Sequence, residues 1–171
     1  RVTTFSFGRE RRLRRRADFL RVQAIGERAT CRHFVMLVAA RVDGPAAPSR
    51  LGIVATKKIG DATMRNRIKR VCRECFRLWP GFVPDGIDLV VIGRLGADEL
   101  PLAKVREEWA QARGALLKRC AKVLAAALLA FAALAQAEQV AVTVLATTDL
   151  HGNLYPIDYV TDKPAARGLA R

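Results

Sequence analysis

The chain has 171 residues, of which 51% are hydrophobic, so it is long enough for one domain with a buried core and a short appendage. Its formal net charge is +14, and the whole surplus belongs to residues 1–77, which hold 20 Lys and Arg against 6 Asp and Glu. The remaining residues are balanced, which excludes a uniformly basic protein and predicts one surface that faces a polyanion.

Residues 1–16 form a basic arm that includes the run RERRLRRR. So many arginines with few apolar residues argue against a packed element. The arm is either a disordered tail or, as we prefer, a mobile segment that folds onto RNA phosphates, with Arg14 and Arg15 among its contacts. Arginine suits this role because its guanidinium donates paired hydrogen bonds to phosphate oxygens.

The next elements are a short helix and two strands. Residues 17–25 predict the helix, with Phe19, Leu20, Val22 and Ile25 available for packing, and Gly26 ends it. Residues 31–41 and 50–56 are rich in Val, Leu and Ile and predict neighbouring strands, joined by a loop with Gly and Pro. We expect these strands to pair antiparallel. That pairing would bring the end of the second strand close to the start of the first, and so Lys57 and Lys58 close to Arg32 and Phe34.

Residues 57–77 predict a basic turn with Lys57, Lys58 and Gly60, followed by a helix with one apolar face and one cationic face. Asp61 stands where an N-cap is expected. A step of 100° per residue places eight apolar side chains on one arc, namely Met64, Ile68, Val71, Cys72, Cys75, Phe76, Leu78 and Trp79. The neighbouring arc holds Asn66, Lys69, Arg70, Arg73 and Arg77. A solvated face usually mixes charge signs, whereas Glu74 is the only acid between residues 64 and 79. The pattern therefore favours an RNA-contacting helix over a merely solvated one.

Further on, prolines and glycines at 80–86 stop the helix, residues 87–94 predict a strand covered on both faces, and residues 100–120 predict a second long helix. The element order is thus α-β-β-α-β-α, which is typical of an α+β fold with helices on a small mixed sheet.

The stretch TKKIGDATMRNRIKRVCRECFR closely resembles the signature of the protein subunit of bacterial ribonuclease P. It carries the lysine pair, the Gly-x-Ala spacing and the Arg-Asn-Arg core at residues 65–67, followed by Lys69 and Arg70. The resemblance covers about residues 7–120 and includes RRLRRRADF and GIDLVVIGR. It implies a left-handed crossover around the central helix, where the general rule would predict a right-handed one.

The resemblance also implies a function. In that family the RNA subunit and its Mg²⁺ ions perform catalysis, while the protein binds the 5′ leader of precursor tRNA and supports the active RNA conformation. We therefore expect no catalytic residue and no metal on the protein alone, a bacterial cytoplasmic location, no obligate protein partner and no membrane for the main domain. For the catalytic RNA we expect contacts from Arg65, Arg67, Lys69, Arg70 and Arg73, with Asn66 fixing local geometry or sharing a polar contact.

For the leader we expect contacts from Phe19, Lys57 and Lys58. The family often has a second aromatic four residues after the position of Phe19, where this chain has Gln23. Stacking of Phe19 on a base and simple packing in the core both stay open.

Other chemistry is weakly represented. Cys72 and Cys75 have C-x-x-C spacing, but both lie on the apolar arc, so buried thiols are favoured over a zinc or redox site. Residues 1–120 contain no paired carboxylates and no Ser-His-Asp set. The competing function is a general RNA-binding or ribosomal-type protein without a role in maturation.

Residues 121–137 have the layout of a secretory signal peptide, because Lys118, Arg119 and Lys122 precede an apolar run that ends in an A-x-A site. A plain extension of the preceding helix is the alternative, and we expect helix in either case. Residues 138–171 resemble the truncated start of a secreted metallophosphoesterase or nucleotidase. Asp149 and His151 match its first motif, but the other ligands do not follow, so we assign no metal site.

We accordingly divide the chain into an arm at 1–16, an RNA-binding domain at 17–120, the signal-like segment at 121–137 and the phosphoesterase-like segment at 138–171. Our hypothesis is that one reading frame is joined here to the truncated start of another. The tail alone would correspond to a fragment of a secreted metal-dependent phosphohydrolase.

Overall fold

The computed structural model describes residues 7–134, 157–158 and 163–164. It divides into two compact units, residues 1–136 and residues 137–171. In the second unit, β5 (Ile157–Asp158) pairs antiparallel with β6 (Lys163–Pro164). All other described elements belong to the first unit.

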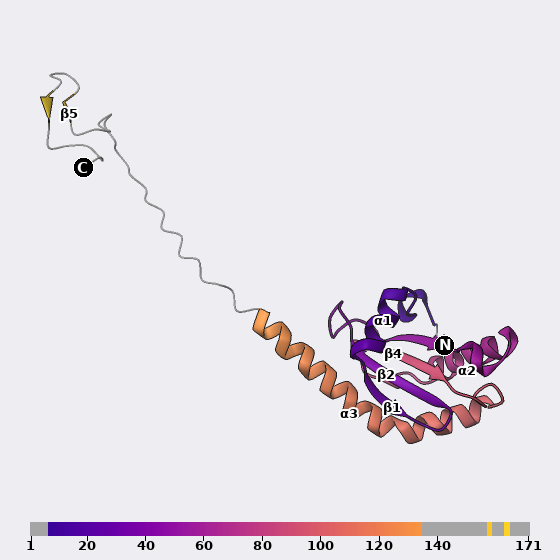
Figure 1. Ribbon diagram of the computed structural model, residues 1–171. Helices are drawn as coiled ribbons and strands as arrows, with labels where there is room; N and C mark the ends of the chain where they lie inside the picture. The colour runs from indigo at the N-terminus through magenta and orange to yellow at the C-terminus, as the bar shows by residue number, and fades with distance from the viewer. Residues whose placement is uncertain (1–6, 135–156, 159–162, 165–171) are drawn as a thin grey trace, which may run out of the picture. The chain divides into compact units, whose positions relative to one another are not determined.

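The first unit is built on a four-stranded mixed sheet of order β1-β2-β4-β3 (Figure 1). Its strands are β1 (Glu27–Thr30), β2 (Phe34–Ala40), β3 (Arg50–Val54) and β4 (Ile87–Gly93). The helices are α1 (Arg16–Ile25), α2 (Ala62–Arg77) and α3 (Leu102–Leu134), with the 3₁₀ turns η1 (Arg9–Arg11) and η2 (Lys57–Ile59). The predicted α+β class with a small mixed sheet is confirmed, and the four-residue strand β1 was not predicted.

The predicted pairing of β2 with β3 is wrong, because β4 lies between them. β4 pairs antiparallel with β2, where Phe34 faces Gly93, and parallel with β3, where Val54 faces Ile92. Its apolar run from Leu89 to Ile92 suits it to an inner position in the sheet, covered on both faces and bonded on both edges. The end of β3 and the start of β2 still share one end of the sheet, with β4 separating them.

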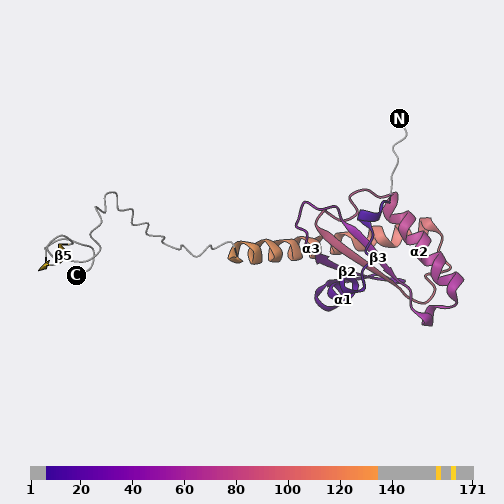
Figure 2. The same cartoon turned by 90° about the horizontal axis from the view of Figure 1, so that it is seen from above.

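The two faces of the sheet are covered unequally, as Figure 2 shows from above. One face carries α2 and α3, and its core includes Phe34, Leu89 and Trp109. We call this the α2/α3 face. The opposite face carries α1 over a smaller cluster, in which Val22 is fully buried while Phe19 and Ile92 are only partly buried. We call this the α1 face.

Helix α2 forms as the sequence predicts. The Asp61 side chain accepts a hydrogen bond from the Met64 backbone N–H at 2.8 Å, which satisfies one free N–H of the first turn. Its buried residues are Ile68, Cys72, Cys75 and Phe76. Met64, the first member of the predicted apolar arc, is an exception because it is 43% exposed.

The prediction of an unpacked arm is wrong for the described part of it. Phe7 and Leu13 are buried, and the Phe7 ring lies edge-on to Phe76 at 5.9 Å between ring centroids. The Leu13 N–H donates to the Leu51 carbonyl at 3.0 Å, so the segment pairs with the free edge of β3. Two apolar residues in an arginine-rich run are enough to fix it here, because an edge strand offers unpaired backbone groups. Residues 1–6 lie outside the described part.

Helix α3 begins at Leu102 and continues to Leu134 without a break. Trp109, Leu116 and Cys120 are fully buried, which confirms the predicted second long helix. The helix expected for the apolar run after Cys120 is also confirmed as far as Leu134. No helix in the described ranges combines the length and apolar character needed to cross a membrane.

Candidate nucleic-acid interface

The exposed side of α2 carries a dense group of cations. Arg67, Arg70 and Arg73 are exposed beside Asn66, and Lys69 is half-buried. We call these five residues the α2 cationic surface. Within the described ranges, no acid forms an ion pair with any of them. The opposite side of the helix is sealed into the core, so these charges stand on a rigid support.

Two other arginines of α2 are engaged within the protein. The Arg77 guanidinium donates to Glu74 at 2.9 Å, and this hydrogen bond lowers the pKa of the Glu74 carboxyl. Arg65 donates to the Gly60 carbonyl at 2.7 Å, which ties the helix to the turn before it. Arg65 was predicted to contact RNA, and the structure gives it a local structural bond as well.

The turn before α2 presents the predicted lysine pair. Lys57 and Lys58 are exposed, while Ile59 is buried and anchors η2 to the core. Gly60 has φ 154°, and a Cβ at this position would lie 2.2 Å from the Met64 sulfur. Glycine is favoured there because other residues rarely adopt this backbone conformation, whereas the exposed Met64 side chain could move away from a Cβ.

The N-terminal segment adds arginines at the edge of β3. The Arg11 guanidinium lies over the Phe76 ring at 5.1 Å, so it borders α2. Arg12 lies over the Phe7 ring at 5.0 Å and donates to the Phe7 carbonyl at 2.9 Å. The segment therefore passes from the α2/α3 face, where Phe7 is buried, to the α1 face, where Leu13 is buried.

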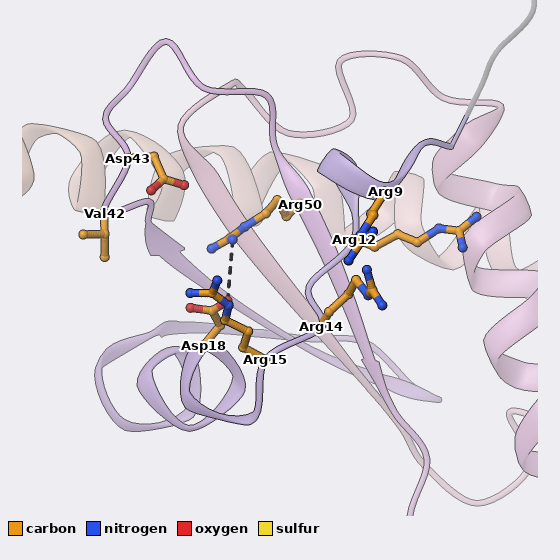
Figure 3. A pocket seen from close by; sticks show the side chains of 8 residues that line it. All are labelled: Arg9, Arg12, Arg14, Arg15, Asp18, Val42, Asp43 and Arg50. Atoms are coloured by element: carbon orange, nitrogen blue, oxygen red, sulfur yellow. Dashed lines mark ion pairs between the residues drawn. The ribbon is translucent and has the colours of Figure 1, made fainter.

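A pocket of about 750 Å³ lies beside this segment (Figure 3). Its lining residues are Arg9, Arg12, Arg14, Arg15, Asp18, Val42, Asp43 and Arg50. Arg9, Arg12 and Arg14 gather at one side of it, whereas Arg50 pairs with Asp18 at 3.5 Å. Arg14 and Arg15 were predicted to contact RNA. Arg50 was not predicted, because it reaches the pocket only through the fold.

A buried acid connects the two sides of this region. Asp88 of β4 is fully buried and accepts hydrogen bonds from Arg50 at 2.7 and 2.8 Å. It also pairs with Arg21 of α1, which donates to the Ala40 carbonyl at 2.8 Å. The bonds to Asp88 raise the pKa of the Arg50 guanidinium. Asp88 was overlooked, although a single acid inside an apolar strand signals a buried cationic partner.

Phe19 lies where α1 meets β3. A Cβ added to Gly52 would come within 2.6 Å of the Phe19 ring, so the glycine allows the ring to lie directly on the strand backbone. The ring is half-buried, and Gln23 one turn later is exposed. β3 continues from Gly52 to Val54, and Lys57 follows three residues after the strand ends. The Phe19 ring of α1 thus lies on β3, and the lysine pair predicted for the leader lies in the turn that follows the same strand.

The cysteines offer no reactive site. Burial is the main cause that raises the pKa of Cys75 to about 12 and those of Cys31 and Cys120 to about 11, and it raises the pKa of Cys72 as well. These thiols stay protonated near neutral pH. In the part of the chain that the structure describes, no group of three His, Cys, Asp or Glu is placed to hold a metal. Asp149 and His151 lie outside that part.

Comparisons with known proteins agree with this architecture. The family model described as Ribonuclease P matches residues 7–120. The ribonuclease P protein component of Thermotoga petrophila is 44% identical over 108 residues, which cover 63% of this chain and 83% of that protein. The resemblance of residues 138–171 to a secreted phosphoesterase gains no support from these matches.

Solved structures agree as well. The RNase P protein from Thermotoga maritima superposes with a TM-score of 0.53 at 40% identity, covering 63% of this chain and 96% of that one. The RNase P protein of Staphylococcus aureus gives 0.53 at 29% identity and covers 60% and 91%. This chain therefore belongs to the ribonuclease P protein family, the protein components of a ribonucleoprotein endoribonuclease that processes tRNA.

Proposed function

We propose that the α2 cationic surface binds the catalytic RNA of ribonuclease P and that the α1 face binds the 5′ leader of precursor tRNA. The observation that supports this most strongly is the asymmetry of α2. Four buried residues fix one side of the helix, and exposed Arg67, Arg70 and Arg73 stand on the other. Closely placed cations with no acidic partner repel one another, and a polyanion relieves that repulsion.

The individual side chains have separate roles in this proposal. Arg67, Arg70 and Arg73 donate paired hydrogen bonds to phosphate oxygens, and Lys69 adds a point charge beside them. Arg65 holds the Gly60 turn while it borders the same surface. Asn66, which is exposed, supplies a neutral polar contact that does not depend on phosphate charge.

The leader would follow the path from the pocket of about 750 Å³ beside the N-terminal segment, which we call the arginine pocket, to the lysine pair. Arg14 and Arg15 meet phosphates at the pocket, the Phe19 ring offers a stacking surface for an unpaired base, and Lys57 and Lys58 meet phosphates beyond the end of β3. The Asp88 ion pairs hold α1 against the sheet and so keep Phe19 in place.

The protein's contribution to catalysis is positional. In this proposal the RNA would hold the Mg²⁺ ions, which would supply water activation and leaving-group stabilisation, and the protein lowers the repulsion between two polyanions that must dock. The working location is the bacterial cytoplasm, where precursor tRNA is made.

Reconstitution tests the proposal directly. The full chain is added to a bacterial ribonuclease P RNA and precursor tRNA at low Mg²⁺, where the RNA alone cleaves slowly. We expect the protein to stimulate release of the 5′ leader, and a substrate whose leader is shortened to one nucleotide should benefit less. RNA binding without stimulation would favour the competing general RNA-binding protein.

A further inference from the structure

The last part of α3 exposes apolar side chains on all sides. Val123 and Leu124 still pack against the core, but every described side chain from residue 125 to residue 132 is exposed, and all eight are Ala, Leu or Phe. Leu129 and Phe131 are 73% and 74% exposed. Figure 1 shows this end of α3 projecting beyond the sheet. A helix that is apolar on all sides is typically surrounded by apolar groups, either in a protein core or in a lipid bilayer.

The apolar surface continues onto the neighbouring loop. A groove of about 780 Å³ runs between this end of α3, including Leu124, Leu128 and Phe131, and residues 40–45. Val42 in that loop is 80% exposed. The groove adds to the apolar area that the protein leaves in contact with water.

Cations stand immediately before this apolar segment. Lys118 and Lys122 are exposed and Arg119 is half-buried, and the sequence contains no acid between Glu108 and Glu138. Lys122 pairs with Glu27 at 2.6 Å, and this contact lowers the pKa of the Glu27 carboxyl. Arg119 donates to the Ala115 carbonyl. The result is a cationic collar directly beside an apolar helix end.

We propose that the end of α3, residues 118–134, inserts into the surface of an anionic phospholipid bilayer and so tethers the RNA-binding domain to a membrane. The apolar side chains enter the acyl region, while Lys118, Arg119 and Lys122 stay at the anionic headgroups. The twelve residues from Val123 to Leu134 span about 18 Å of helix, which suits partial insertion.

A second copy of the chain fits this surface less well. Helix pairing needs one apolar stripe per partner, whereas these side chains point in all directions. Pairing would also bring two cationic collars into one assembly, where they repel each other. An anionic bilayer satisfies both the all-round apolar surface and the positive charge.

Vesicle flotation with the full chain tests the proposal. The probes are vesicles of phosphatidylglycerol and phosphatidylethanolamine, compared with vesicles of phosphatidylcholine alone. The basic RNA-binding surface can also attract anionic vesicles, so binding is compared at low salt and at about 1 M salt, where the Debye length is about 3 Å. We expect the protein to float with the anionic vesicles and part of it to remain bound at high salt.

Three sets of substitutions locate the contact. The triple variant Leu128→Ser, Leu129→Ser, Phe131→Ser keeps every charge and should bind at high salt at least about tenfold more weakly. A matched control, Leu20→Ser, Ile25→Ser, Leu95→Ser, removes three exposed apolar side chains elsewhere and should float like the parent. Lys118→Gln, Arg119→Gln, Lys122→Gln should weaken binding mainly at low salt. An unchanged far-UV circular dichroism spectrum and thermal unfolding transition show that each variant is folded.

Three outcomes would overturn the proposal. The parent chain could fail to float, or the Leu128 triple variant could float as well as the parent, which would assign vesicle binding to the RNA-binding surface. Sedimentation could instead show a parent dimer that the triple variant loses, with no vesicle binding, and a second copy would then be the occupant.

Discussion

The two faces of the sheet differ in how completely they are covered, and this difference separates stability from recognition. The α2/α3 face buries Trp109, Phe34 and four residues of α2, and it holds α2 rigidly. The α1 face has a small cluster in which Phe19 and Ile92 are only partly buried. The larger core of the α2/α3 face supports the charges of α2, while the smaller core of the α1 face leaves the Phe19 ring accessible to a base.

The two faces also use arginine differently. On the α1 face, Arg21 and Arg50 share the buried carboxylate of Asp88 and serve the structure. On α2, Arg67 and Arg70 are exposed and no described acid pairs with them. The same side chain is a structural tie where a buried acid faces it and a ligand-binding group where none does.

The largest expected effect is that of Trp109→Ala, in the core of the α2/α3 face. Trp109 is fully buried, 5.0 Å from the Phe82 ring and 6.3 Å from the Phe34 ring, so its removal leaves a large cavity. We expect the free energy of unfolding to fall by about 3 to 5 kcal/mol in urea denaturation. Trp109→Phe should cost much less, because it keeps most of the ring volume and removes a buried indole N–H that has no described partner. Equal losses in both variants would contradict this account of the core.

The corresponding test of the α1 face is Asp88→Ala. It leaves Arg21 and Arg50 without their shared acid, but their side chains are 24% and 17% exposed to solvent. We therefore expect a loss of about 2 to 3 kcal/mol in the free energy of unfolding, below the usual cost for a fully buried pair. Ser49→Ala, at a buried neutral residue directly before Arg50 and β3, is the control and should cost less. Leader affinity measured on the folded fraction should also drop, because α1 loses its tie to the sheet.

The comparison is sharpened by Arg67→Ala on α2. Removing one phosphate contact should weaken binding to the catalytic RNA by about 1 to 3 kcal/mol and leave unfolding unchanged. Lys104→Ala is the matched control, because Lys104 is an exposed cation on α3 that already pairs with Glu107 at 2.9 Å. Filter binding at moderate salt measures both variants. If both lost the same affinity, net charge and not the α2 cationic surface would govern binding.

The smallest expected effect concerns the Cys75 thiol in the core of the α2/α3 face. The folded-state pKa of Cys75 is raised by burial from 9.0 to about 12, so the folded protein holds its proton more tightly than the unfolded chain. The resulting stability is complete below about pH 9 and is lost as the pH rises toward 12. Between pH 8 and pH 10 the parent should lose about 1 kcal/mol more unfolding free energy than Cys75→Ala. Urea titrations at the two pH values measure this difference, and identical losses would show that the thiol is not buried in solution.

Local patterns were sufficient to predict α2 and its N-cap, because helix periodicity and capping depend on neighbouring residues. They were also sufficient for the α+β class. The strand order was mispredicted because β4 must be compared with both β2 and β3 at once, and no local pattern ranks those pairings. The packing of Phe7 and Leu13 was missed for the same reason, since their partners Phe76 and Leu51 are distant in sequence.

The site was only partly predictable. Exposed cations on α2 follow from its periodicity, whereas the arginine pocket needs residues from three separate segments. Arg9 and Arg14 come from the N-terminal segment, Val42 from the loop after β2, and Arg50 from β3. Whether Phe19 stacks on RNA also depends on Gly52, which permits its close approach to the strand.

The salt dependence of RNA binding tests the central claim most directly. Affinity for the catalytic RNA is measured across a salt series for the parent and for the variant Arg67→Gln, Arg70→Gln, Arg73→Gln. If the α2 cationic surface meets phosphates as a rigid array, the slope of log affinity against log salt should become shallower by about 2 to 3, near 0.7 to 0.9 for each lost contact. An unchanged slope in a folded variant would contradict the claim.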